Sequence, residues 1–359
     1  MGIISSRYTC WRYYSAFRYT ILHLFDEKEE RCCEMKKFGG FTMVIIVGLL
    51  LLIAVSLLSL RLGAVPTPLA EIIEGLMTGE GVVLKYRLPR LIIAILVGIN
   101  MALSGSILQS VTRNPLAAPD IIGVSAGGGL AAVIVLLMFP TVPAIMLPVA
   151  AFVGAMIASL LVYVLSYQKG GIKPERLALC GVAISTGLQA LITFIIVKFA
   201  VDSSQALVWL KGSLYARSWE HVDMLWPWTI IGAIITFASY KQMNLLLLNE
   251  ETVKGLGMRI NAVRLVLIGV AVALAASSVA VAGTISFVGL VIPHAARLLV
   301  GSDSRLFLPV SALLGALLVT GADMVGRIII PPIEIPAGII TALIGAPYFI
   351  YLLVIRKRT

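Results

Sequence analysis

Long apolar runs separated by short polar breaks make up most of this chain. Residues 87–129 show the pattern clearly: an arginine-flanked proline leads into a long apolar run, a polar break follows, and a glycine-rich run returns to apolar sequence. A run of about 20 apolar residues is long enough to cross the hydrocarbon core of a bilayer. The runs are continuous and do not alternate with polar positions, so they predict helices and not the strands of a β-barrel.

The same pattern predicts an all-α polytopic membrane protein with about ten transmembrane helices. Small residues inside the run at 88–111, such as Gly98, Gly105 and Ser106, suit close contact between helices in lipid. The expected membrane spans lie at 41–60, 88–111, 121–139, 145–166, 177–199, 225–243, 264–282, 284–300, 306–326 and 337–355.

Residues 1–42 do not continue this pattern, because aromatic and basic residues are followed there by a charged run. This composition fits a disordered tail, a start codon assigned too far upstream, or an amphipathic helix at the membrane interface. Met35 and Met43 would each be a natural first residue of the membrane part. We therefore expect a transmembrane domain at 43–358, with a polar connector at 244–263.

Composition and charge exclude an ordinary soluble protein. The 359 residues are 59% hydrophobic and 13% charged, whereas a soluble protein carries about 25% charged residues. The net charge of +10 is explained by basic loops on the cytoplasmic side of a membrane, so we expect no nucleic-acid partner. Contact with membrane lipid is expected instead.

The distribution of basic residues orients the predicted spans. With the N-terminus inside, the inner segments from residue 35 onward carry 15 Lys and Arg residues and the outer segments carry 8. The rule that cytoplasmic loops are the more basic ones therefore places both termini in the cytoplasm. Arg87, Arg90 and Arg327 fall on the outer side against this rule, so they need a functional explanation.

A weak internal repeat accompanies the topology. At an offset of 178 residues, Gly105 aligns with Gly283 and Pro115 aligns with Pro293. The two units would run in opposite directions through the membrane, which is a common plan in transporters. The pattern predicts an inverted repeat, although glycine-rich apolar segments also align by chance.

The chain lacks the residues of an enzyme or of a nucleotide site. It has no G-x-x-x-x-G-K-[ST] phosphate loop, so ATP would have to be bound and hydrolysed by a separate subunit. Its three histidines and four cysteines show no metal-ligand spacing, and no cofactor is expected. The predicted spans carry almost no charge, which argues against a proton-coupled secondary transporter but leaves ion coupling through backbone carbonyls open.

The connector at 244–263 reads as a small projecting helix. Asn249 is placed to cap it, and Glu250 and Glu251 follow in its first turn, where acidic residues suit the helix dipole. Gly255 and Gly257 then end the helix after two turns at most. Such a projecting helix, which we call the knob, could be moved by a soluble subunit that binds it. The alternative is an ordinary polar loop.

Several long motifs resemble those of the FecCD family, the permease subunits of type II ABC importers for iron–siderophores, haem and vitamin B12. The resemblance covers about residues 43–358. Its motifs are RLPR at 87–90, ALSGSILQ at 102–109, RNPLAAPDIIGVSAG at 113–127, GTISFVGLVIPHAARLLVGSDSR at 283–305, LPVSALLGA at 308–316 and EIPAGIITALIGAPYFIYLL at 334–353.

The resemblance implies a subunit of ten spans in a homodimer or heterodimer, with two ATPase subunits on its cytoplasmic face and an extracytoplasmic substrate-binding protein outside. In the family, outer arginines receive acidic residues of the binding protein. The matching residues here are Arg87, Arg90 and Arg327. Their alternative role is snorkelling to lipid headgroups.

Coupling helices of the family match 247–257, which includes Asn249, Glu250, Glu251, Val253, Gly255 and Gly257. Val253 stands where the family more often has Ala, so a change in its fit to the ATPase is expected. The family's path follows the dimer axis along the fifth and tenth spans. Ser185, Thr186 and Gln189 are the candidates for lining it here, with helix packing as their alternative role.

The sequence therefore predicts a non-enzymatic permease subunit in a bacterial cytoplasmic membrane. It would carry an iron chelate, and among these a ferric siderophore is expected. A haem or vitamin B12 permease is the alternative within the family, and an ion-coupled secondary transporter is the alternative outside it.

Overall fold

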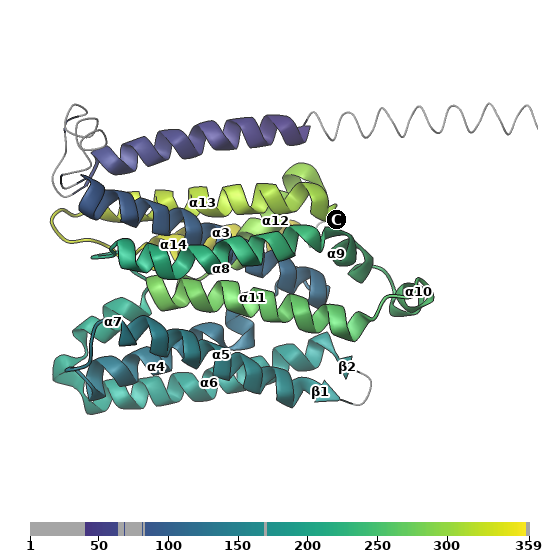
Figure 1. Ribbon diagram of the computed structural model, residues 1–359, viewed down its shortest axis with the longest axis horizontal. Helices are drawn as coiled ribbons and strands as arrows, with labels where there is room; N and C mark the ends of the chain where they lie inside the picture. The colour runs from purple at the N-terminus through teal and green to yellow at the C-terminus, as the bar shows by residue number, and fades with distance from the viewer. Residues whose placement is uncertain (1–39, 64–67, 69–80, 82, 169–170, 357–359) are drawn as a thin grey trace, which may run out of the picture.

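The computed structural model describes residues 40–63, 68, 81, 83–168 and 171–356, and most of this part of the chain is helical (Figure 1). Within these described residues, seven helices are long and apolar enough to cross a membrane. They are Gly40–Arg61, Val83–Thr112 (which joins η1, Val83–Arg87, to α3, Leu88–Thr112), α5 (Met146–Ser166), α6 (Pro174–Lys198), α8 (Trp219–Ala238), α11 (Ile260–Ala282) and α13 (Ser304–Ile328).

Three shorter helical stretches are also apolar: α4 (Val124–Met138), α12 (Val288–Val300) and the part Ala337–Tyr351 of α14 (Ala337–Arg356). Together with the seven long helices they correspond to the ten predicted spans. The prediction of an all-α membrane protein with about ten helices is therefore confirmed. The expectations for the N-terminal tail up to residue 39 concern residues outside the described part.

The remaining elements are short. They are η2 (Pro119–Ile122), η3 (Ala200–Asp202), α7 (Ser204–Leu210), α9 (Tyr240–Leu246), α10 (Glu250–Gly255) and the antiparallel pair β1 (Tyr167–Gln168) and β2 (Gly171–Ile172). α10 and the β1–β2 pair lie at one end of the bundle and α7 lies at the other, and α10 projects from its end (Figure 1). We call the first of these the α10 end.

The core is built around α3, which packs against α8, α11, α12 and α13. Small residues make this packing close. A methyl group at Gly98 would overlap the backbone of Gly315 in α13, and one at Gly105 would overlap the carbonyl oxygen of Gly289 in α12. Lipid gives no hydrophobic force between helices, so such backbone contact supplies the packing energy. The predicted packing role of these glycines is confirmed.

Other helices expose apolar side chains, as a membrane protein requires. Only 17% of the helix Gly40–Arg61 and 11% of α6 is buried within their most apolar windows. Large side chains such as Leu50, Leu179 and Phe194 are exposed. These surfaces match the apolar bilayer core.

The two halves of the bundle contain similar breaks. α3 ends at Arg113, whose φ of 51° is left-handed, and η2 and Gly123 lead from there to the short helix α4. α11 ends before Gly283, and Phe287, with a φ of 69°, leads to the short helix α12.

The predicted offset of 178 residues is wrong as a register for the repeat. Gly105 lies inside α3, whereas its partner Gly283 follows the end of α11. The similarity lies instead in the order of elements, which is a long helix, a break and a short helix in each half. The register was wrong because the two glycine-rich apolar segments were matched by their similar composition, and matching residues do not occupy equivalent positions in the structure.

Candidate functional site

Four arginines gather at the end of the bundle opposite α10, which we call the arginine end. Arg87, Arg90, Arg217 and Arg327 line a cavity of about 700 Å³ there, together with Glu334. Arg87 and Arg90 stand at the start of α3, and Arg327 stands in the last turn of α13. The arrangement brings together residues that are far apart in the sequence.

Arg90 is bound to two carboxylates. Its Nε lies 3.1 Å from each oxygen of Asp323, and its Nη2 lies 2.7 Å from Oδ1 of the same residue. Its Nη1 donates to Oε2 of Glu334 at 2.8 Å. Such a fork of hydrogen bonds between a guanidinium and a carboxylate is both strong and specific in direction.

Arg327 is buried beside the same acid. Its Nε lies 3.2 Å from Oδ2 of Asp323, and 6% of its side chain is exposed. Its Nη1 donates to the carbonyl of Ser59 at 3.1 Å and its Nη2 donates to the hydroxyl of that residue at 2.5 Å. Arg327 therefore ties α13 to the helix Gly40–Arg61, whereas the sequence placed it on the outer surface.

Arg87 and Arg217 complete the cluster. Arg87 donates through Nη1 to the carbonyls of Leu60 at 2.7 Å and Arg61 at 3.2 Å. Burial, and next the nearby charge of Arg90, lowers the pKa of the Arg217 guanidinium to about 10. An arginine with that pKa stays charged at neutral pH.

A second, larger cavity lies beside α6. It has a volume of about 960 Å³, and the three predicted path residues Ser185, Thr186 and Gln189 all line it. Further lining residues are Asp120, Ser125, Ala126, Ala190, Ile192, Thr193, Ile196, Leu207, Leu210, Lys211, Thr284 and Ser286. The cavity thus mixes hydroxyl and amide groups with the apolar side chains that make up most of its surface. The described part of α14 contributes no lining residue, although the family resemblance predicted a path along the tenth span.

Asp120 is the carboxylate of this cavity. It lies in η2, and its side chain accepts a hydrogen bond from the hydroxyl of Ser125, with the hydroxyl of Ser286 close by. These two residues stand just inside α4 and just before α12, so the carboxylate connects the two breaks of the fold. Lys211, exposed after α7, supplies a positive charge.

The α10 end carries the predicted knob. Asn249 occupies the N-cap position of α10, without a capping hydrogen bond from its side chain, and Gly257, with a φ of 79°, follows the helix. Glu251, Lys254, Gly255 and Leu256 are exposed. The knob thus presents both charged and apolar groups to a partner.

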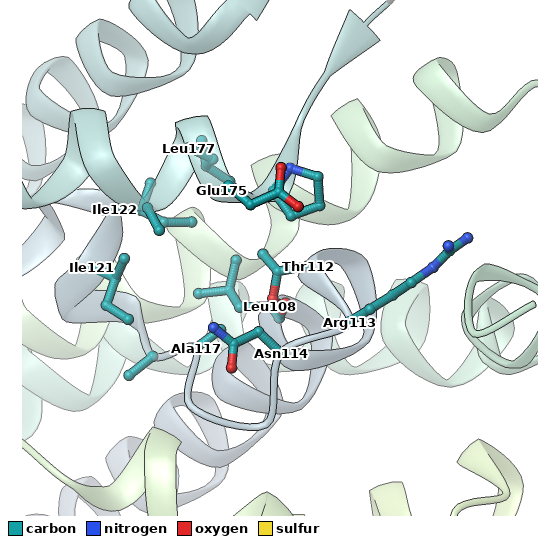
Figure 2. Close-up of a pocket in the computed structure, with 12 residues that line it drawn as sticks. Leu108, Thr112, Arg113, Asn114, Ala117, Ile121, Ile122, Glu175 and Leu177 are labelled. Carbon is teal, nitrogen blue, oxygen red and sulfur yellow. Dashed lines mark hydrogen bonds between the residues drawn. The ribbon is translucent and has the colours of Figure 1, made fainter. Parts of the chain in front are cut away.

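A third cavity, of about 220 Å³, lies between the bend after α3 and the start of α6. Thr112, Asn114 and Ala117 line it from the bend, and Glu175 and Leu177 line it from α6. Figure 2 shows the side chain of Arg113 pointing away from these residues. Among the described residues, no group of three or more His, Cys, Asp or Glu side chains is placed to hold a metal ion.

A family model described as "FecCD transport family" matches residues 50–355. The chain belongs to the FecCD transport family. This FecCD permease is 45% identical to the Fe(3+)-citrate import system permease protein YfmE of Bacillus subtilis, over 88% of this chain and 96% of that protein. It is 40% identical to the Fe(3+) dicitrate transport system permease protein FecD of Escherichia coli, over 83% of this chain and 94% of that protein.

A solved structure, described as an inward-facing conformation of a putative metal-chelate type ABC transporter, resembles this FecCD permease with a TM-score of 0.76. The identity is 29%, over 88% of this chain and 99% of that one. The predictions of a FecCD family member, of its ABC-importer permease fold and of a transport subunit that is not an enzyme are confirmed. It is a multi-pass protein of the cell membrane, and an importer of this kind works with an ATPase and a binding protein.

Within the FecCD permease, Val253 of α10, which was expected to contact the ATPase, points into the permease instead. The side chain of Val253 is fully buried in the core cluster. The expectation that this valine changes the fit to an ATPase is therefore wrong. The physical reason is that α10 is short and amphipathic, so one of its positions has to face the permease.

Sequence reasoning did not assign roles to several residues of these sites. Asp120, Lys211 and Thr284 line the cavity beside α6 but were not among the predicted candidates, and Arg217 was not grouped with the outer arginines. A signal existed for Asp120, because it follows the proline-rich break at 113–119 and lies next to a Gly-Val-Ser-Ala-Gly segment. No local signal connects Arg217 with Arg90.

Proposed function

We propose that this FecCD permease carries a ferric chelate across the membrane through the cavity beside α6. The observation that supports this most strongly is the cavity itself. Its volume of about 960 Å³ is at the upper end of the roughly 300–1,000 Å³ typical of small-molecule sites. Its hydroxyl and amide groups suit a cargo whose outer surface is polar.

The charge of the cavity favours a chelate that bears carboxylates. Lys211 offers an ammonium group to the cavity, whereas the carboxylate of Asp120 accepts a hydrogen bond from the hydroxyl of Ser125. Ferric citrate and carboxylate siderophores carry negative charge on their surfaces. Both named relatives import ferric citrate, which supports the same choice over haem or cobalamin.

The two ends of the bundle suit two different partners. We assign the α10 end to the cytoplasm, where an ATPase subunit would bind α10 through Glu251, Lys254 and Leu256. The segment 249–257 supplies this contact, with Asn249, Glu250, Gly255 and Gly257 shaping it and Val253 anchoring it from inside. Both chain termini would then lie in the cytoplasm.

The arginine end suits an acidic binding protein outside the cell. Five cationic side chains meet three carboxylates there, so the cluster is positive: Lys85, Arg87, Arg90, Arg217 and Arg327 face Glu220, Asp323 and Glu334. An acidic residue of the binding protein would compete with Glu334 for Arg90 and would contact Arg87 directly. Arg327 would hold the surface in shape from beneath.

A second permease subunit, identical or related, would complete the path. Thr186 and Gln189 are exposed on α6 although they are polar and α6 is membrane-spanning. Polar side chains that face lipid are unfavourable. A second copy packed along α6 would remove these groups from lipid and enclose the cavity, with an ATPase on each copy.

Reconstituted vesicles test the proposal. Vesicles that contain the permease with its ATPase inside and its binding protein outside should accumulate radioactive iron supplied as ferric citrate when they are loaded with ATP. They should not do so when they are loaded with a non-hydrolysable ATP analogue. Haem and cobalamin should not compete. Uptake of cobalamin without uptake of ferric citrate would overturn the substrate, and uptake driven by an ion gradient without ATP would overturn the mechanism.

A further inference from the structure

Arg113 spans the gap between two elements that serve different parts of the proposed transport cycle. It is the C-cap residue of α3, with the left-handed φ of 51°. Its Nε donates to the carbonyl of Leu246, the last residue of α9, at 2.6 Å, and its Nη2 donates to the carbonyl of Leu248. α10 begins two residues farther on, at Glu250.

The chemistry of this contact calls for an arginine. The last carbonyls of a helix have no partner inside the helix and carry the negative end of its dipole. A guanidinium presents several donors in a fixed plane, so it can bind the carbonyl of Leu246 at the end of α9 and that of Leu248 just beyond it at once, whereas an ammonium group is a point charge. The backbone of Arg113 adopts a conformation that a residue with a side chain rarely keeps unless its surroundings hold it.

On its other side, Arg113 begins the bend that leads to the path. The bend continues into η2, where Asp120 accepts a hydrogen bond from Ser125 at the cavity. η2 also touches α6 closely, because a methyl group at Gly181 would overlap the carbonyl oxygen of Ile121. The end of the bend is therefore in direct contact with α6, whereas the third cavity leaves space between the bend and α6 near Asn114.

α9 is held at a second point. Nδ2 of Asn244 donates to Oδ1 of Asp303 at 2.8 Å, and the backbone N–H of Ser304 donates to Oδ1 of Asn244 at 2.8 Å. Asp303 caps α13. Side-chain hydrogen bonds thus attach the segment that carries α10 to the start of α13 through Asn244 and to the bend after α3 through Arg113. Of these two residues, Arg113 belongs to the bend that leads to the cavity.

We propose that Arg113 is the positioning residue that transmits movement of α10 to η2 and the path. The inference rests on the proposed function, since it takes α10 to be the contact with the ATPase. Arg113 touches neither the chelate nor ATP. Its loss should uncouple ATP hydrolysis from transport without preventing assembly.

The test compares Arg113→Gln and Arg113→Lys with wild type in the complete complex. Lys241→Gln is the matched control, because it removes a positive charge from an exposed position on α9. Two quantities are measured in vesicles: the ferric citrate imported per ATP hydrolysed, and the nucleotide-dependent labelling by a maleimide of a cysteine placed at Gln189. The second readout uses a background in which the four native cysteines, Cys10, Cys32, Cys33 and Cys180, are replaced by serine, and it needs no chelate.

Arg113→Gln should keep its ATPase subunits and its ATP hydrolysis while import per ATP falls about tenfold, as expected from losing two charge-assisted hydrogen bonds. The nucleotide-dependent change in labelling should disappear. Arg113→Lys should lie between Arg113→Gln and wild type, and Lys241→Gln should equal wild type. If Arg113→Gln does not assemble, the intermediate values of Arg113→Lys carry the test.

Wild-type import per ATP and wild-type labelling in both Arg113 variants would overturn the proposal. A parallel loss of hydrolysis and import, with unchanged import per ATP, would show a merely structural role and would also overturn it. Failure of the proposed function would be seen in a different measurement, because wild-type vesicles would then import no ferric citrate. In that event the labelling readout still decides the role of Arg113.

Discussion

Removing the charge of Asp323 tests the ion-pair cluster at the arginine end. The carboxylate of Asp323 is 3% exposed and lies 2.7 Å from Nη2 of Arg90 and 3.2 Å from Nε of Arg327. Asp323→Asn keeps the shape of the side chain but leaves these two guanidinium groups with Glu334 as their nearby acid. The substitution therefore tests the contribution of the negative charge at position 323 without changing the size of the side chain.

The size of the effect follows from the burial of the cluster. Breaking a buried ion pair by removing one partner costs about 3–5 kcal/mol, because the other charge stays buried. Glu334 continues to bind Arg90 at 2.8 Å, so we expect the lower end, about 3 kcal/mol. Replacing both partners by apolar residues is often neutral, so Asp323→Leu combined with Arg327→Leu should lose less stability than Asp323→Asn.

Unfolding of the purified permease in mixed micelles with increasing SDS measures this free energy for each variant. The double replacement serves as the internal control, since it removes both members of the Asp323–Arg327 pair and leaves Arg90 with its second acid, Glu334. A loss below about 1 kcal/mol for Asp323→Asn, the range of an exposed ion pair, would refute the reasoning. Equal losses for the single and the double replacement would do so as well.

Three further predictions concern packing, docking and coupling. Gly105→Ala should cost about 1–3 kcal/mol of stability, measured as a lower unfolding midpoint, whereas Gly269→Ala, where a methyl group has open space, should change nothing. Lys85→Glu should raise the Kd for the binding protein about fivefold, measured by titrating the binding protein over immobilised permease, and the effect should be smaller at high salt. An unchanged Kd at low salt would contradict the docking assignment. Val253→Ala should cost about 1–2 kcal/mol of stability and leave the affinity for the ATPase unchanged, whereas Leu256→Ala, at an exposed position, should lower that affinity in pull-down titrations. A loss of ATPase affinity in Val253→Ala but not in Leu256→Ala would contradict the orientation of α10.

Much of the architecture was predictable because the bilayer imposes length and polarity on each span. The runs around 88–111 and 306–326 became α3 and α13, and the glycines at 98 and 105 became contact points, since close packing in lipid requires small residues. The polar residues Ser185, Thr186 and Gln189 were recognisable because hydroxyl and amide groups are conspicuous within an apolar helix. All three line one cavity.

The contacts between distant segments were not predictable in the same way. Arg90 and Asp323 are separated by 233 positions, and no periodicity relates them. The side on which Val253 lies depends on how α10 packs on the bundle, which a six-residue helix does not encode in its own pattern. Arg113 looked like part of a surface turn, and its role depends on where α9 ends.

The cavity beside α6 is the centre of this account, and blocking it tests the account most directly. A cysteine at Gln189 is modified with a bulky maleimide in vesicles that hold the complete complex, and ATP-driven uptake of ferric citrate is measured before and after. A cysteine at the exposed Gln168 of β1 is the control. The account predicts that modification at Gln189 abolishes uptake and modification at Gln168 leaves it unchanged. Full uptake after complete modification at Gln189 would contradict it.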